Sequence, residues 1–280
     1  MNDFDPVRHY DESGEREWER LERSFYHELE VEETGHFLED HLPAEGDVLD
    51  VGGGAGRYSV WLAERGYEVV LVDPSERQVE LAASKAAEHG FESRVTTAVG
   101  DGRDLPHDAD AFDATLCLGG PLSHVLEESG RRAGAQELRR VTAPGGPVFV
   151  SVMGLLAALQ TVVRFAGTIP PAEDETELLP ALARSGDYDA DLLDGVDREP
   201  TAPPMHLFRV AELEDLLADA GLSVETVSGL ESVVSQRRQD FDELDEGHRE
   251  AIRAAVRELR GDRMAADLSG HFLAVARVPE

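Results

Sequence analysis

The stretch that decides the fold is DVLDVGGGAG, residues 47–56. Its apolar residues Val48, Leu49 and Val51 end at a run of glycines, and an amphipathic pattern of helical period begins directly afterwards at Tyr58. This order predicts a buried strand, a tight turn and a helix. Because glycine permits positive φ angles and lets a ligand approach main-chain amides, the turn predicts a binding site.

The spacing of the glycines indicates which ligand the turn suits. Gly52, Gly54 and Gly56 form G-x-G-x-G, preceded by Asp50, whereas the dinucleotide fingerprint G-x-G-x-x-G requires glycine or alanine where this chain has Arg57. A carboxylate beside the turn repels a pyrophosphate and attracts an ammonium group. The stretch resembles the first motif of class I S-adenosylmethionine-dependent methyltransferases, which implies that the loop holds the methionine half of that cofactor.

A second acidic residue follows at the spacing of a βαβ unit. The next apolar strand ends at Asp73, 21 residues after Gly52. This spacing places the Asp73 carboxylate beside the loop, where it can accept hydrogen bonds from both hydroxyls of a ribose. NAD and S-adenosylmethionine both carry such a ribose. Ser75 is the predicted N-cap of the following helix, with Gln78 as the fourth residue of a capping box.

Further motifs continue the resemblance over about residues 45–152. The Gly-Asp pair at Asp101 resembles the motif whose carboxylate takes the adenine amino group, the strand over 112–117 follows at the family's interval, and a Pro-Gly-Gly turn over 144–146 precedes a fifth strand. The implied cofactor is S-adenosylmethionine, with S-adenosylhomocysteine as product. The implied cofactor contacts are Asp50, Gly52, Gly54, Gly56, Asp73, Pro74, Gln78, Asp101, Gly102, Arg103 and Leu118.

The predicted fold is α/β: a Rossmann-like, doubly wound sheet of seven mostly parallel strands. The resemblance implies that the last strand, over 271–278, is antiparallel and lies between the fifth and sixth. We expect four segments: an N-terminal cap of two amphipathic helices, the cofactor-binding core, an insertion or lid over the acceptor site, and a C-terminal completion of the sheet. They span residues 1–45, 46–152, 153–206 and 207–280. The insertion begins with an amphipathic helix over 153–167, then shows little periodicity.

The charge of the chain is strongly acidic. Its 280 residues include 58 Asp and Glu against 26 Lys and Arg, of which only Lys85 is lysine, and the net charge is −32. Acidic residues also occupy the well-patterned segments, which predicts the solvated surface of a protein from a halophilic source. Such a surface disfavours nucleic acid, whose phosphates need clustered cations. An RNA or tRNA methyltransferase stays open as an alternative, since high salt screens charge.

The compartment is predicted from cysteine usage and hydropathy. Cys117 is the one cysteine, so a reducing cytoplasm is expected. It is followed by leucine, and we interpret it as a buried strand-end residue rather than a nucleophile. The first residues show no signal-peptide pattern. The longest apolar stretch, 153–167, contains Gln160 and Arg164 and is too short to span a bilayer. No membrane association is expected, and the oligomeric state stays open.

The activity implied by the resemblance is in-line transfer of a methyl group to a small-molecule acceptor, whose identity and methylated atom stay open. If the acceptor needs deprotonation, His124 and His206 are the candidate bases, because histidine titrates near neutral pH. Gly119 and Gly120 are expected to leave open space for the acceptor. The candidate pocket residues are Tyr10, Trp18, Tyr26, Gly119, His124 and His206.

No metal site is expected, because no group of residues shows metal-ligand spacing. Two further alternatives stay open. An NAD(P)-dependent reductase is disfavoured by Arg57, by Asp50 and by the lack of a Tyr-x-x-x-Lys pair. A non-catalytic cofactor-binding protein would keep the fold but have its acceptor pocket closed by side chains above Gly119.

Overall fold

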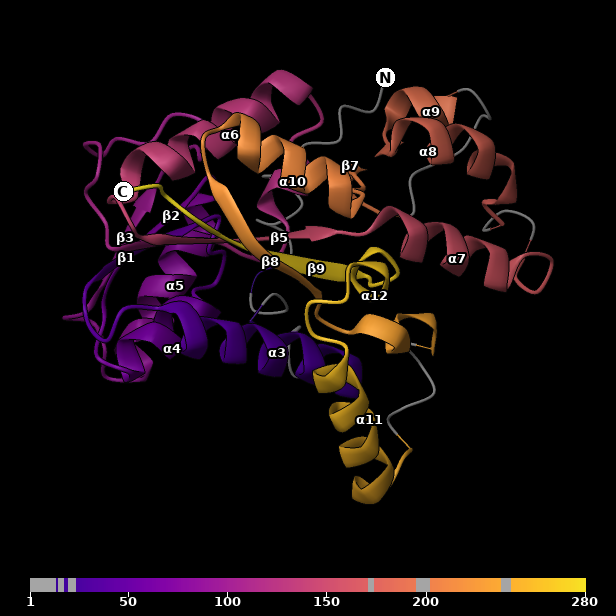
Figure 1. Ribbon diagram of the computed structural model, residues 1–280, viewed down its shortest axis with the longest axis horizontal. Coiled ribbons are helices and arrows are strands. Elements are labelled where there is room, and N and C mark those ends of the chain that lie inside the picture. Colours follow the sequence, from indigo (N-terminus) through magenta and orange to yellow (C-terminus); the bar gives the residue numbers. More distant parts are fainter. Residues whose placement is uncertain (1–13, 15–17, 20–23, 171–173, 195–201, 238–242) are drawn as a thin grey trace.

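The computed structural model of the chain describes residues 14, 18–19, 24–170, 174–194, 202–237 and 243–280. A seven-stranded sheet lies at its centre, in the order β3-β2-β1-β4-β5-β9-β8 (Figure 1). The strands of this sheet are β1 (Asp47–Val51), β2 (Glu68–Asp73), β3 (Val95–Val99), β4 (Ala114–Cys117), β5 (Pro147–Met153), β8 (Ser223–Gly229) and β9 (His271–Arg277).

The pairing of the strands confirms the predicted fold class. Strands β1 to β5 are parallel to one another, and β9 runs antiparallel between β5 and β8. The central strands are apolar on both sides because helices cover both faces of the sheet. Since β9 is antiparallel, its first residue lies at the edge where β1, β4 and β5 end.

Helices form two layers around this sheet (Figure 1). Leu116 and Phe149 face one layer and pack with Phe37, whereas Leu49 and Val150 face the other. The first layer contains α3 (Phe25–His41), α4 (Arg57–Glu64) and α5 (Glu76–Glu88). The second contains α6 (Glu128–Val141) and α10 (Val210–Asp219).

The segment between β5 and α10 is more ordered than its sequence indicates. After α7 (Leu155–Phe165), its described parts contain η2 (Thr176–Leu178), α8 (Leu179–Ser185), β6 (Asp187–Tyr188), α9 (Ala190–Asp194) and β7 (Met205–His206), and β6 pairs with β7. The elements after α7 are too short for a helical or strand periodicity of apolar residues to show in the sequence. They enclose their own apolar cluster, which includes Leu155, Leu182 and Leu207. In Figure 1, α7, α8 and α9 lie beyond the end of β5.

The remaining elements of the described chain are helical. They are η1 (Pro121–His124), η3 (Ser232–Arg237), α11 (Glu246–Glu258) and α12 (Arg263–Asp267). Helix α11 projects away from the sheet (Figure 1), and Arg253 in it pairs with Glu32 of α3 at 2.9 Å. Of the two helices expected over residues 1–45, α3 is described, whereas most of the segment before it lies outside the described residues. Within the described residues, no helix has the length and apolarity needed to cross a membrane.

Candidate cofactor and acceptor site

The glycine loop between β1 and α4 has the conformation that its sequence predicts. Gly52, Gly54 and Gly56 have φ angles of 68°, 52° and 82°. A Cβ on Gly52 would lie 2.5 Å from Cγ of Pro121, and one on Gly56 would lie 2.9 Å from Cβ of Ala82. Larger side chains are therefore opposed both by the backbone angle and by the packing of the next elements.

Asp50 lies beneath this loop and is 1% exposed. Its Oδ2 accepts a 2.7 Å hydrogen bond from the Ser59 hydroxyl, whereas its Oδ1 has no hydrogen-bond partner among the described residues. Burial, with a smaller contribution from the nearby charge of Asp73, raises the pKa of Asp50 to about 6, although the hydrogen bond from Ser59 lowers it. A buried carboxylate oxygen without a donor is unfavourable. It fits a ligand that brings an ammonium group or another donor to this loop.

Asp73 joins the loop to the end of β2. Its Oδ2 accepts a hydrogen bond from the amide of Gly54, and its Oδ1 accepts one from the amide of Ser75, both at 2.9 Å. The Ser75 hydroxyl accepts from the Gln78 amide at 3.1 Å, as a capping box requires, but the Ser75 amide donates to Asp73 instead of Gln78. Gln78 itself is fully buried, and Pro74, next to Asp73, is exposed. Asp73 thus lies beside the glycine loop; its bond to a ribose stays a prediction.

The loop after β3 carries an Asp–Arg pair. Arg103 Nε lies 2.9 Å from Asp101 Oδ1, and its Nη2 lies 2.6 Å from Asp101 Oδ2. These hydrogen bonds hold the pKa of Asp101 below its usual range. A Cβ on Gly102 would lie 2.8 Å from the Val51 side chain, which packs this loop on the end of β1. An adenine arriving here would meet an ion pair rather than an isolated carboxylate. Leu118, the other residue expected near the cofactor, is 5% exposed.

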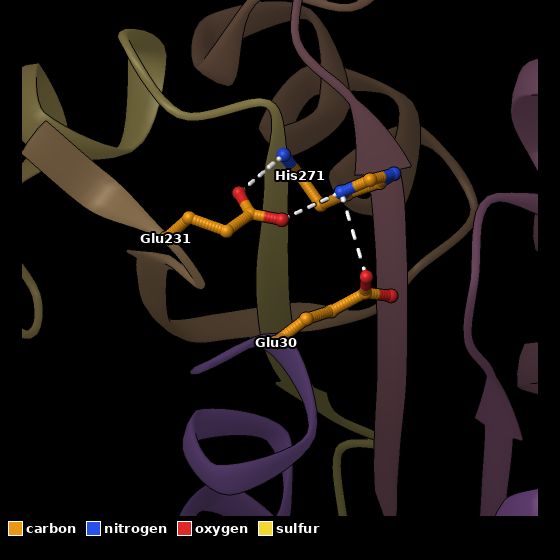
Figure 2. Close-up of side chains that lie close together, drawn as sticks. All are labelled: Glu30, Glu231 and His271. Carbon is orange, nitrogen blue, oxygen red and sulfur yellow. Dashed lines mark hydrogen bonds and ion pairs between the residues drawn. The ribbon is translucent and has the colours of Figure 1, made fainter. Parts of the chain in front are cut away.

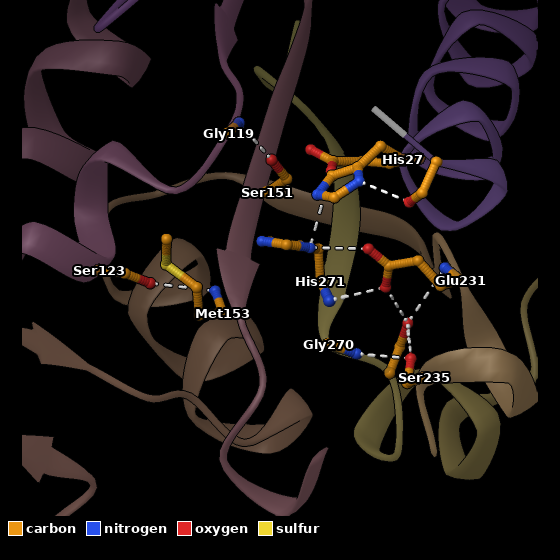
Figure 3. A network of polar contacts seen from close by, with 12 residues as sticks. His27, Gly119, Ser123, Ser151, Met153, Glu231, Ser235, Gly270 and His271 are labelled. Atoms are coloured by element: carbon orange, nitrogen blue, oxygen red, sulfur yellow. Dashed lines mark hydrogen bonds and ion pairs between the residues drawn. The ribbon is translucent and has the colours of Figure 1, made fainter. Parts of the chain in front are cut away.

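The end of β4 contacts the end of β5. The Gly119 amide donates to the Ser151 hydroxyl at 2.8 Å, and the Met153 amide donates to the Ser123 hydroxyl at 3.0 Å (Figure 3). A Cβ on Gly120 would lie 2.7 Å from the Met153 sulfur. The expectation of open space at Gly120 is therefore wrong, because a thioether side chain from the neighbouring strand fills it.

The two histidines predicted as bases are both engaged. His124 Nδ1 lies 3.1 Å from the carbonyl oxygen of Pro204. His206 is 3% exposed, and its Nδ1 and Nε2 each lie 2.6 Å from a carboxylate oxygen, of Asp187 and of Glu212. Burial raises the pKa of Glu212, but the hydrogen bond from His206 brings it below its usual range. His206 joins β7 to α10, an arrangement that leaves neither nitrogen for an acceptor.

The aromatic pocket candidates that the structure describes, Trp18 and Tyr26, have different neighbours. Tyr10 is outside the described residues. The ring of Trp18 lies 5.1 Å from the guanidinium of Arg57 and 5.5 Å from the ammonium of Lys85, so it packs on α4 and α5. Tyr26 is buried at the start of α3, edge-on to His27 with ring centroids 5.4 Å apart. Trp18 therefore packs on α4 and α5, whereas Tyr26 is buried in α3 beside His27.

A cluster that the sequence did not predict lies at the edge of the sheet where β1, β4 and β5 end, which is named the acceptor edge because the sequence predicts the acceptor there. His271 Nδ1 lies 2.7 Å from Glu231 Oε1 and 3.8 Å from Glu30 Oε2 (Figure 2). One ligand atom from each residue lies within 4.8 Å of the others, which a metal site also requires. No sequence spacing indicates this, because Glu30 and His271 are distant in the chain. The antiparallel last strand was the available signal, since it puts His271 at this edge.

Comparison with known proteins agrees with the fold and the glycine loop. Residues 48–146 match the family described as a methyltransferase domain. Methyltransferase GfsG of Streptomyces halstedii is 31% identical over 156 residues, covering 54% of this chain and 49% of that protein. The chain thus spans about half the length of that relative.

Two solved structures extend the likeness to most of the chain. A Methanosarcina mazei S-adenosylmethionine-dependent methyltransferase is similar over 87% of this chain and 97% of its own, with 19% identity and a TM-score of 0.59. The methyltransferase chain solved in complex with the Haloferax volcanii Trm112 methyltransferase activator is similar over 99% of both chains, with 17% identity and a TM-score of 0.58. Residues 48–146, around the glycine loop, are thus similar to a methyltransferase domain, and most of the chain shares the fold of a solved S-adenosylmethionine-dependent methyltransferase.

Proposed function

We propose that this chain transfers a methyl group from S-adenosylmethionine to a small-molecule acceptor and releases S-adenosylhomocysteine. The observation that carries the proposal is the buried Asp50 oxygen without a partner, beneath a glycine loop that Asp73 borders. The sulfonium cofactor supplies an already activated methyl group. The protein then has to hold the acceptor in line with it, which can contribute about 7–11 kcal/mol to catalysis in favourable cases.

The residues around the loop divide the recognition of the cofactor. Asp50 attracts the ammonium group, Asp73 accepts from the ribose hydroxyls, and the Asp101–Arg103 pair meets the adenine edge. Leu118 supplies apolar contact. In this proposal residues 46–152 bind the cofactor, and residues 153–206 form the lid over the acceptor.

The surface charge supports a small acceptor rather than RNA. With 58 acidic and 26 basic residues, the chain lacks the excess of cations with which proteins neutralise phosphates. The likeness to the methyltransferase chain in the Trm112 complex, at 17% identity, supports the fold and does not extend that partner to this chain. We further infer a halophilic source, from the same charge, and a cytoplasmic setting, because Cys117 is the one cysteine of the chain.

Calorimetric titration in 2 M KCl tests the cofactor. We expect S-adenosylhomocysteine to bind with micromolar affinity, NADH and NADPH not to bind, and Asp73→Asn to weaken the binding at least tenfold. Asp219→Asn is the matched control, because Asp219 of α10 pairs with Arg132 of α6 and neither residue belongs to the glycine loop. Binding of a nicotinamide cofactor by the wild-type protein would replace this proposal with the reductase.

A further inference from the structure

His271 shares one face of the sheet with residues at the end of β5. It is the direct cross-strand partner of Met153, and Leu273 is the partner of Ser151. Directly opposed side chains of an antiparallel pair point to the same face, as do alternate residues of one strand. Ser151 and Met153 are the residues that contact Gly119 and Gly120. The His271 side chain therefore lies on the same face of the sheet as the side chains that contact the loop after β4, on the side where the acceptor is expected.

Glu231 holds the imidazole of His271 in one orientation. Its Oε1 lies 2.7 Å from His271 Nδ1, and its Oε2 accepts hydrogen bonds from the amide of His271 and the hydroxyl of Ser269, both at 2.9 Å (Figure 3). Ser269 is fixed in turn, since its oxygen accepts from the amide of Ser232 at 2.9 Å. A carboxylate can only accept, so the proton of a neutral His271 lies on Nδ1 and the lone pair on Nε2.

The imidazole can be reached from outside, whereas its carboxylates cannot. The side chain of His271 is 12% exposed, against 0% for Glu231 and 1% for Glu30. Figure 2 shows the Nε2 end of the ring pointing away from both carboxylates. The ring of His27, from α3, lies beside His271 (Figure 3). The Ser24 hydroxyl lies 2.8 Å from Nδ1 of His27 and fixes that ring. His27, Glu30 and Glu231 are thus the titratable groups that face His271 from the packed elements.

We propose that His271 is the general base of the methyl transfer and that Glu231 is its positioning residue; this inference rests on the proposed function. His271 Nε2 takes the proton from an O–H or N–H group of the acceptor. The lone pair of that heteroatom forms the bond to the methyl carbon, while the methyl–sulfur bond breaks and its electron pair passes to sulfur. The products are the methylated acceptor, the neutral thioether and an imidazolium that is paired with Glu231.

This arrangement selects a class of acceptor. A hydroxyl or an ammonium group carries a proton that must leave before its lone pair can attack, so a fixed base is useful to it. A tertiary amine or a thioether has no such proton and gains nothing from His271. The acceptor is therefore a small molecule with a protonated oxygen or nitrogen. The cluster contributes typically 10²–10⁴-fold to its reaction.

Nitrogen-15 NMR of the imidazole side chains tests the proton position without an acceptor. His271→Gln assigns the signal, and in the wild-type protein we expect neutral His271 to carry its proton on Nδ1. Glu231→Gln should mix the two tautomers, because the amide group brings a donor to a place where a carboxylate only accepts. His248→Gln is the matched control, since His248 also pairs with a carboxylate, Asp245, but is 68% exposed on α11.

Two NMR results would overturn the proposal. A neutral His271 protonated on Nε2 would have no lone pair for the acceptor. Tight binding of Zn²⁺ that shifts the His271 signals and is lost in Glu30→Gln would show that Glu30, Glu231 and His271 form a metal site instead.

Transfer of tritiated methyl groups to a panel of small phenols, amines and thioethers tests the chemistry. For each O–H or N–H acceptor found, His271→Gln should lower kcat by 10²–10⁴-fold and abolish the fall in activity at low pH, with S-adenosylhomocysteine affinity unchanged. Glu231→Asp should recover part of the activity that Glu231→Gln loses. Full activity of His271→Gln, or activity of the wild type on thioethers alone, would contradict the role of His271 as a general base. If the wild-type protein does not bind S-adenosylhomocysteine, that result would instead contradict the proposed function.

Discussion

The amide of Gly54 donates a 2.9 Å hydrogen bond to the carboxylate of Asp73, so the glycine loop and the end of β2 are joined in the protein alone. Gly52 contributes a second link, since its amide donates to the carbonyl oxygen of Val72 at 2.7 Å. A loop that is already fixed loses less conformational entropy when a ligand binds.

Gly56→Ala should destabilise the protein more than Gly90→Ala. The two glycines have similar φ angles, 82° and 79°, but a Cβ on Gly56 would lie 2.9 Å from Ala82, whereas one on Gly90 meets nothing within 4 Å. Backbone strain should cost both variants about 1–2 kcal/mol, and overpacking about 1–3 kcal/mol more at Gly56. Urea unfolding at one salt concentration measures both values. Equal losses would show that the contact with Ala82 relaxes freely.

Asp50→Asn should stabilise the ligand-free protein at pH 8 but not at pH 4. The folded state holds the pKa of Asp50 at about 6, above its ordinary 3.8, so between these values the folded protein binds more protons than the unfolded chain. Stability therefore falls as the pH rises through this window, and the loss, about 3 kcal/mol, persists above it. Asparagine removes this loss.

Thermal unfolding across pH 4–8 measures the difference between the wild type and Asp50→Asn, and calorimetry should show weaker binding of S-adenosylhomocysteine by the variant. Asp47→Asn, at the exposed start of the same strand, is the control. If Asp50→Asn is no more stable than the wild type at pH 8, Asp50 does not carry a buried charge.

Cys117 should resist thiol reagents in the folded protein. Burial, together with the charge of Asp50, raises the pKa of its thiol to about 12, so almost no thiolate exists at pH 8. Ellman's reagent should react with it only after guanidinium unfolds the chain. Rapid reaction in native buffer would instead support a nucleophilic role at the end of β4.

Salt should stabilise the fold. Even if each of the 26 cations pairs with one acid, 32 of the 58 acidic residues keep an uncompensated charge (58 − 26 = 32). Raising KCl from 0.1 to 1 M shortens the Debye length from about 10 to about 3 Å, which weakens this repulsion more than it weakens the fewer ion pairs. The midpoint of thermal unfolding should rise with KCl. Choline chloride should act equally at equal ionic strength, and a response to potassium alone would indicate specific ion binding.

The strands, turns and helix starts of the glycine-loop region were predictable, because each is indicated by residues that are neighbours in the sequence. The strand ending at Val51, the turn at Gly52 and the helix N-cap at Ser75 each depend on neighbouring residues only. Contacts between distant segments were not predictable. Met153 filling the space at Gly120 depends on the side-chain length of a neighbouring strand.

The cluster at the acceptor edge could not be predicted for the same reason. Glu231 and His271 are 40 residues apart, and only the folded chain brings them together with Glu30. His206 had the residue type of a base, but both of its ring nitrogens contact carboxylates, of Asp187 and of Glu212, which its sequence position does not indicate.

The place of β9 as the last strand in the chain sets the order in which the two halves of this site can form during synthesis. The glycine loop and Asp73 leave the ribosome early, with the strands that fix them, whereas His271 follows almost the whole sheet. A nascent chain can therefore build its cofactor pocket while the acceptor edge still lacks Glu231 and His271. If His271 is the base, the growing polypeptide cannot methylate anything before β9 has inserted between β5 and β8.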